Sequence, residues 1–302
     1  MNSRTFTFYG LIAIVIWGTS AAFTRTLSES LGTFTAAALV NTIAGLIAMA
    51  DQFLRRGGMK RLRKAPLRYW LSCGLLFIFY TVTSYASVSL ASNRAQVTIV
   101  VLIKFLWPLL TLLLTIPILK AKASPWLTGS VLVSMAGIVV ANLGGRIQDP
   151  AAFLASISLN LLPYILGLAS ALAWALYSNL GRRFIGESEE GGAGFFILAT
   201  GLVLGLFSLT RSEPRHISPA LIGQLLYQSI MTTFVATLLW DASMRKGNIV
   251  VVAAASNFLP AVTVILTALM LGVAITMPML VGSALIVGGT IWSKRCFKSN
   301  AA

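Results

Sequence analysis

A lysine within an apolar run is the residue of this sequence best suited to specific chemistry. Lys104 lies in the segment VVLIKFLWP. If that segment crosses a bilayer as a helix, inserting the ammonium group costs about 2.5–3.5 kcal/mol, and charges at such depth usually serve a function. None of the eight Asp and Glu residues is expected at the same depth. Two explanations stay open: the ammonium pairs with backbone carbonyls as part of the structure, or it faces a water-filled cavity and binds an anionic group such as a carboxylate.

Aromatic residues at helical spacing with small polar residues form a second set. Residues three or four positions apart share a helix face, so Trp17 lies with Ser20 and Thr24, and Trp174 lies with Tyr177. Such faces suit a cavity better than lipid, although Trp and Tyr also form interfacial belts and ordinary packing contacts. The candidate substrate-binding residues are Trp17, Tyr80, Lys104, Trp107, Trp174, Tyr177 and Asn257.

Three positions are interpreted from the residues near them in the sequence. Trp107 lies about one turn from Lys104. Asn257 precedes Pro260 by three residues, and a proline leaves the carbonyl one turn back without its amide donor. The amide and that carbonyl could bind an ammonium or hydroxyl group, or Asn257 could bridge two helices. Trp240 lies near the end of its segment, where we expect it in an interfacial belt.

Other kinds of chemistry lack the residues that they need. The sequence holds one histidine, His216, and two cysteines, Cys73 and Cys296, which we interpret as free thiols. It has no HExxH motif, no paired aspartates and no glycine-rich phosphate loop. We therefore expect no catalytic residue, metal or cofactor, and the protein is not expected to be an enzyme. A membrane enzyme and a channel stay as minor alternatives.

Composition indicates the elements that must position these side chains. The chain has 302 residues, of which 57% are apolar and 10% are charged, and its mean hydropathy is +0.85. Soluble globular domains carry about 25% charged residues. A chain this apolar cannot cover a globular surface with polar groups, which excludes a soluble enzyme, a disordered protein and a secreted disulfide scaffold. We expect an all-α integral membrane protein.

The apolar stretches and the charges between them predict a topology. A helix needs about 20 apolar residues to cross a bilayer. The net charge is +15. Most Lys and Arg residues fall in the loops that lie on one side of the predicted membrane, which is also the side of both termini. By the positive-inside rule both termini are cytoplasmic, and the basic excess indicates orientation rather than nucleic-acid binding. The ten predicted transmembrane helices cover 6–27, 33–54, 66–90, 96–118, 125–142, 161–182, 194–210, 219–241, 248–271 and 276–293.

The two halves of the sequence repeat one another. GLIAIVIWGTSAAFTR, which begins at Gly10, aligns with GLASALAWALYSNLGR, which begins at Gly167, and ASNRAQVTIVV aligns with ASMRKGNIVVV. FLWP and NFLP, then WLTGSVLV and MLVGSALI, follow in the same order. We predict two five-helix repeats, 1–145 and 146–302. Because five is odd, the repeats must be inverted, which is typical of alternating-access transporters with a substrate site near the midplane.

The residues that carry this pattern also resemble a known family. GLIAIVIW (10–17), SESLG (28–32), LLFIFY (75–80) and FLWPLLT (105–111) are similar to the drug/metabolite transporter superfamily, EamA type, and within it to exporters of aromatic amino acids. The resemblance covers the whole chain. It implies an inner-membrane exporter of aromatic or other neutral amino acids and related metabolites, with a central cavity between the repeats. The family pattern does not require a lysine at position 104, so Lys104 could mark a different substrate range.

Substrate alternatives and coupling stay open. An exporter of drug-like amines is the alternative, although a cationic drug would be repelled by Lys104. The first stretch contains no Asp or Glu, which argues against proton antiport through a buried carboxylate there and favours facilitated efflux. Phosphorylated sugars would need several cavity cations. The expected partners are a small-molecule substrate and membrane lipids, without nucleic acid, and a monomer would suffice.

Overall fold

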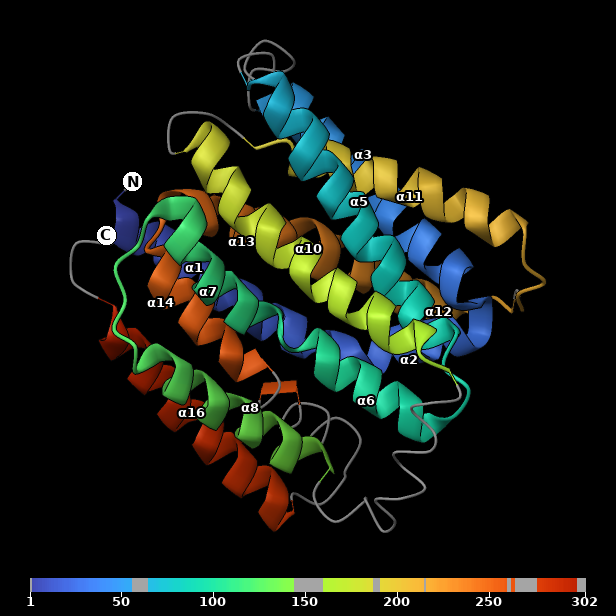
Figure 1. Ribbon diagram of the computed structural model, residues 1–302. Helices are drawn as coiled ribbons and strands as arrows, with labels where there is room; N and C mark the ends of the chain where they lie inside the picture. Colours follow the sequence, from blue (N-terminus) through green and yellow to red (C-terminus); the bar gives the residue numbers. More distant parts are fainter. Residues whose placement is uncertain are drawn as a thin grey trace.

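The computed structural model describes residues 2–55, 65–143, 160–186, 191–214, 216–259, 262–263 and 276–297, and its named elements are all helices (Figure 1). The helices of the first half are α1 (Ser3–Gly18), α2 (Ser20–Leu31), α3 (Thr33–Arg55), α5 (Leu67–Ser89), α6 (Arg94–Lys104), α7 (Trp107–Leu119) and α8 (Leu127–Leu143). Those of the second half are α10 (Leu162–Ile185), α11 (Ala193–Leu209), α12 (Pro219–Tyr227), the π-helix η1 (Gln228–Val235), α13 (Ala236–Lys246), α14 (Ile249–Ala255), the 3-10 helix η2 (Ser256–Phe258) and α16 (Met277–Cys296).

These helices fit a protein that crosses a membrane several times. Within the described ranges, helix covers part or all of each predicted stretch, which confirms the all-α class. Four helical segments are long and apolar enough to span a bilayer, and the bent pair α1–α2 makes a fifth. The four are Thr33–Leu54, Leu67–Ser89, Ile99–Leu119 and Pro219–Lys246. The number of ten crossings and the inverted repeat stay predictions.

Two stretches that the sequence predicts as continuous helices are interrupted. The first bends by 50° between α1 and α2, where the Thr19 hydroxyl donates to the Ile16 carbonyl at 2.7 Å. Hydroxyls that bond back to the preceding turn often bend helices. The fourth breaks between α6 and α7, because Pro108 has no amide hydrogen to donate to the carbonyl of Lys104.

The helices pack as pairs across the molecule. The most extensive contacts join α8 to α16, α3 to α11, α5 to α10, and α1 to α13. Figure 1 shows α3 and α11 on one flank and α8 and α16 on the opposite flank, with the other helices between them. The start of α1 and the end of α16 lie at the same end of the bundle, here called the termini end. The opposite end, where α2 turns into α3 at Gly32, is called the far end.

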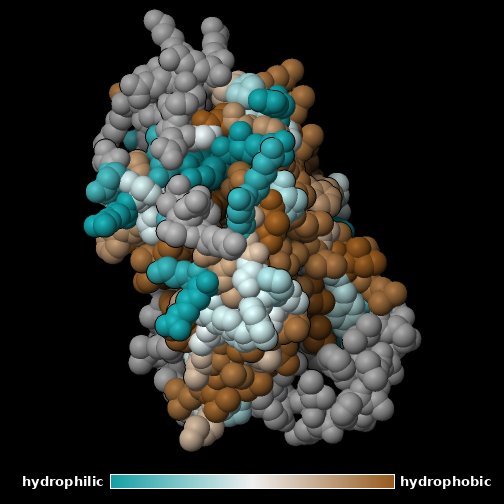
Figure 2. All heavy atoms as spheres, turned by 60° about the vertical axis from the view of Figure 1, so that its left-hand side comes forward, coloured by the Kyte–Doolittle hydropathy of each residue, from teal (hydrophilic) through white to brown (hydrophobic). Residues whose placement is uncertain are grey.

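Polar and apolar surfaces are separated. Figure 2 brings the termini end forward and shows hydrophilic side chains gathered on that end, while hydrophobic side chains cover much of the flanks. A flank of this kind is suited to lipid contact. Exposed basic residues near the helix ends at the termini end include Arg4, Lys120, Lys122, Lys294 and Arg295.

Close helix packing depends on a glycine in the pair α3–α11. A Cβ atom on Gly201 would lie 2.6 Å from the backbone nitrogen of Thr42 and 2.9 Å from the carbonyl carbon of Asn41. Gly205, one turn further along α11, has open space at the same position. The GxxxG spacing of the sequence therefore has one glycine at the helix contact and one away from it.

Gly201→Leu should separate α3 from α11 and destabilise the protein, because overpacking of this kind costs about 1–3 kcal/mol. We expect a clearly lower thermal midpoint in detergent, measured by tryptophan fluorescence or loss of the monodisperse peak. Gly205→Leu is the matched control and should melt close to wild type. Equal destabilisation by the two substitutions would contradict the described packing.

Candidate functional site

Two adjoining cavities lie inside the bundle. The first has a volume of about 280 Å³ and the second about 270 Å³. Together they are within the range of small-molecule sites, about 300–1,000 Å³. Both cavities are lined by Trp17, Ser20, Tyr80, Ser84, Lys104 and Trp174. Four of the seven predicted site residues therefore meet at the boundary between the cavities.

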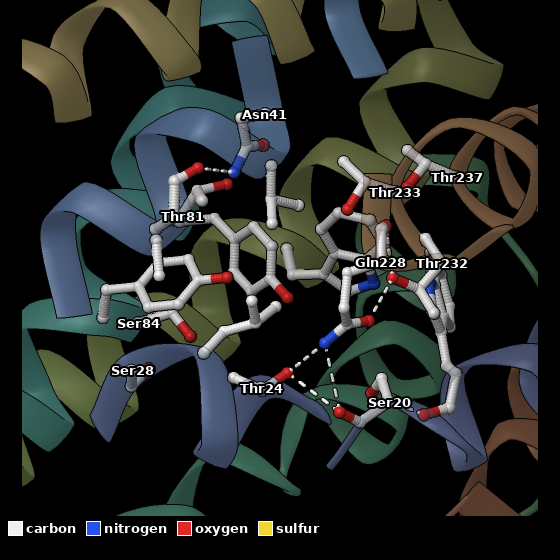
Figure 3. A pocket seen from close by; sticks show the side chains of 18 of the residues that line it. Ser20, Thr24, Ser28, Asn41, Thr81, Ser84, Gln228, Thr232, Thr233 and Thr237 are labelled. Carbon is white, nitrogen blue, oxygen red and sulfur yellow. Dashed lines mark hydrogen bonds between the residues drawn. The ribbon is translucent and has the colours of Figure 1, made fainter. Parts of the chain in front are cut away.

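The first cavity reaches toward the far end and has many polar side chains in its wall. It extends to Leu27 and Ser28 of α2 and to Ala36 of α3, close to the turn between those helices. Figure 3 shows its hydroxyl and amide side chains pointing into a common space. They are Ser20, Thr24, Ser28, Asn41, Thr81, Ser84, Gln228, Thr232, Thr233 and Thr237.

A glutamine in the π-helix η1 joins this wall to the bent first stretch. The Gln228 amide nitrogen donates to the Ser20 carbonyl at 3.1 Å and to the Thr24 hydroxyl at 2.5 Å (Figure 3). The Trp17 indole nitrogen donates to the Thr232 carbonyl at 2.9 Å. A π-helix alters the helical hydrogen-bond ladder and is frequent at functional sites. Gln228 and Thr232 are not among the residues predicted from the sequence, because their spacing gives no signal of a π-helix.

Lys104 satisfies parts of both explanations proposed for it. Its ammonium nitrogen donates to the Ser84 carbonyl of α5 at 3.3 Å, and the side chain also lines both cavities. Lys104 is the last residue of α6, and a cation at a helix C-terminus is stabilised by the helix dipole. Among the described residues that line the two cavities, Lys104 is the only charged one.

Four tryptophans pack together on the termini side of the first cavity. Trp17, Trp107, Trp174 and Trp240 come from α1, α7, α10 and α13, and every pair of rings has a centroid distance between 5.2 and 6.4 Å. Trp107 lines only the second cavity. The expectation that Trp240 belongs to an interfacial belt is wrong: its ring is fully buried and its indole nitrogen donates to the Ser178 hydroxyl at 3.3 Å. The contact of α13 with α1 turns this ring inward.

Beyond the tryptophans, toward the termini end, lies a buried ion pair. The Tyr177 hydroxyl donates to one Asp241 carboxylate oxygen at 3.0 Å. The Arg245 guanidinium donates to the other oxygen at 2.8 and 2.9 Å, and both side chains are about 6% exposed. Tyr177 thus lines neither cavity, although it shares a helix with Trp174. Arg245 lies outside the predicted stretches 219–241 and 248–271, although the spacing of an acid and a base four residues apart was a signal for a helix pair.

Asn257 lies apart from the other predicted residues. It lines a small separate cavity of about 10 Å³, with Phe105 and side chains of α8 and α16. Its amide nitrogen donates to the Ala254 carbonyl at 3.1 Å. Pro260, which motivated the interpretation of Asn257, falls outside the described residues.

The family of the chain follows from its similarity to known proteins. Residues 5–143 and 161–294 match the EamA-like transporter family. The chain belongs to this family. Membership in the EamA-like transporter family, together with the apolar helices, makes it a multi-pass membrane transporter. The resemblance predicted from the sequence is confirmed.

Relatives from bacteria cover nearly the whole chain. The aromatic amino acid exporter YddG of Salmonella typhimurium is 26% identical over 291 residues, which are 96% of this chain and 97% of the relative. The proteins of the same name from Escherichia coli and Ancylobacter novellus are 27% and 26% identical over 293 and 294 residues, 96% of this chain in each case and 97% and 96% of the relatives. A solved crystal structure aligns with a TM-score of 0.78 at 23% identity over 96% of each chain, which shows a shared fold.

The buried pair should matter more for the stability of this EamA-like protein than an exposed pair of the same spacing. Asp241→Asn leaves a buried guanidinium without its carboxylate, and breaking one partner of a buried pair costs about 3–5 kcal/mol. We expect a strong drop of the thermal midpoint in detergent.

Glu29→Gln is the matched control for this measurement. Arg25 and Glu29 also lie four residues apart at 2.8 Å, but their side chains are 72% and 64% exposed. Exposed pairs contribute little, so this variant should melt like wild type. A similar midpoint for both variants would show that the Asp241 pair does not stabilise the bundle.

Proposed function

We propose that this chain is a non-enzymatic exporter of amino acids, aromatic or other neutral ones, and of related metabolites across the cell inner membrane. The observation that carries the proposal is Lys104: a single described cation on the wall of both cavities, beside aromatic rings. The names of the YddG relatives supply the substrate class.

The chemistry of the cavity wall suits a zwitterionic amino acid. The Lys104 ammonium would bind the carboxylate of the substrate in a charge-assisted hydrogen bond. The hydroxyl and amide oxygens of the first cavity would be neutral acceptors for the substrate's ammonium. Tyr80 and Trp174, with ring centroids 4.5 Å apart, offer faces for an apolar or aromatic side chain.

The distribution of closed and hollow regions supports alternating access. The first cavity reaches toward the far end. Toward the termini end, the tryptophan cluster and the pair of Asp241 and Arg245 fill the bundle. With both termini in the cytoplasm, this state would be open to the outside and closed to the cytoplasm, and export would require the opposite state as well.

The helix contacts support an inverted repeat of 1–145 and 146–302. If the sixth stretch is equivalent to the first, and the eighth to the third, the contact of α5 with α10 has its counterpart in the contact of α13 with α1. Both are among the most extensive contacts. The contact of α3 with η1 likewise corresponds to that of α11 with α5. The family pattern also matches the chain twice, once in each half.

The charge of the cavity walls bears on the alternative substrate class and on energy coupling. An exporter of drug-like amines is the alternative substrate class, but a cation would meet the charge of Lys104, with no carboxylate among the described lining residues to offset it. The same lack of a described carboxylate at the cavities favours facilitated efflux over proton exchange at this site.

Replacement of Lys104 tests the substrate class. Lys104→Met should leave the protein folded and lower transport of zwitterionic amino acids at least several-fold in proteoliposomes. An amide or ester analogue, which offers no carboxylate, should be affected less. Lys104→Arg should rescue only in part, because the planar guanidinium has a different shape. Lys122→Met, which removes an exposed lysine, is the control. Equal losses for acid and amide would overturn the carboxylate role.

The orientation can be tested with introduced cysteines. Cys73 and Cys296 are buried, so background labelling should be low. In spheroplasts, a membrane-impermeant maleimide should label Arg211→Cys, at the far end, and should label Lys122→Cys, at the termini end, only after permeabilisation. Labelling of Lys122→Cys in intact spheroplasts would contradict cytoplasmic termini.

A further inference from the structure

The two cavities differ in the chemistry of their walls. Apart from the residues that both share, the first cavity is lined mainly by hydroxyl and amide side chains. The second is lined mainly by apolar side chains, namely Val101, Phe105, Trp107, Ala171 and Leu259. A single ligand that extends across the boundary would therefore have one polar and one apolar part.

Lys104 fixes how such a ligand would lie. Its side chain lines both cavities, and its ammonium nitrogen is held near the Ser84 carbonyl, which belongs to another residue shared by the two. A carboxylate bound to this ammonium would sit at the boundary. The rest of an amino acid has two branches at its Cα atom, a polar amino group and a side chain, and the two walls differ in the same way.

We propose that the second cavity is the side-chain pocket of the transporter and that its walls select large apolar or aromatic side chains. This inference rests on the proposed function. The amino group lies toward the hydroxyl groups of the first cavity. The side chain enters the second cavity between Val101 of α6 and Phe105, which lies in the break after α6, on one side and Ala171 of α10 on the other. Transfer of an apolar side chain from water to such a wall is favourable in proportion to the area buried.

Ala171 limits the pocket from the side of α10. Its side chain is 1% exposed and lies one turn before Trp174. A larger residue here would project into the second cavity without entering the wall of the first, which Ala171 does not line. The first cavity offers a matched position: Ala37 of α3 is also 1% exposed and lines only the first cavity.

The test compares two substrates in wild type and variants. Proteoliposomes with each protein are assayed for transport of labelled tryptophan and labelled alanine, and the result is the ratio of their kcat/KM values. Ala171→Leu should lower this ratio at least tenfold, mostly by loss of tryptophan transport. Ala37→Leu should change both substrates by a similar factor and leave the ratio within about twofold of wild type.

A second narrowing variant guards against misfolding. Val101→Leu reduces the pocket from the opposite wall and should lower the ratio in the same direction, and all variants are compared after monodisperse purification. An unchanged ratio in both Ala171→Leu and Val101→Leu, or the same change in Ala37→Leu, overturns the side-chain pocket. If the wild-type protein transports neither tryptophan nor alanine, the proposed function is overturned instead. The two failures are therefore distinguishable.

Discussion

An ammonium group inside an apolar bundle must be solvated by the protein itself, and the centre of this structure is arranged around that requirement. Lys104 ends α6, where the helix dipole favours a cation, and its nitrogen reaches the Ser84 carbonyl at 3.3 Å. The helix ends there because Pro108 lacks an amide hydrogen. Without the break, Lys104 would lie within a continuous helix, and its carbonyl would already be bonded.

The bend of the first stretch and the π-helix η1 complete the same region. Their hydrogen bonds, through Gln228 and through the indole of Trp17, hold polar groups around the space beside Lys104. The bend, the π-helix and the break between α6 and α7 are all irregular. Each exposes backbone or side-chain polar groups that would be bonded within a regular helix. In a protein that crosses a membrane, irregular backbone is tolerated where it lines a cavity.

The parts of the site that could be predicted from sequence are those set by composition and helical spacing. Lys104 stands out because a charge is rare in an apolar run, and Trp17 and Trp174 stand out because each shares a face with small polar residues. Trp240 and Asp241 could not be placed in this way. Both lie at the end of the predicted stretch 219–241, whereas the helix continues to Lys246, and a sequence does not show whether a side chain at such an end turns toward the interior or toward the interface.

Tyr177 shows a related limit of the spacing argument. It shares a face with Trp174, but it is one turn nearer the termini end, and that distance puts it beyond the tryptophan cluster, bonded to Asp241. Helical periodicity gives the direction of a side chain and leaves its depth relative to a cavity undefined. The first cavity ends at the tryptophan cluster. Its four rings come from four helices far apart in the sequence and meet only in the folded bundle.

The ion pair of Asp241 and Arg245 determines how the termini end of the bundle would respond to water. In the dry bundle the two charges depend on one another and on Tyr177, because separating them there leaves charge without solvation. Once water reaches them, it solvates both, and the force between them weakens several-fold as the local dielectric constant rises. Entry of the first waters would therefore make entry of the next ones easier. Under the proposed alternating access, hydration of this end would therefore be cooperative.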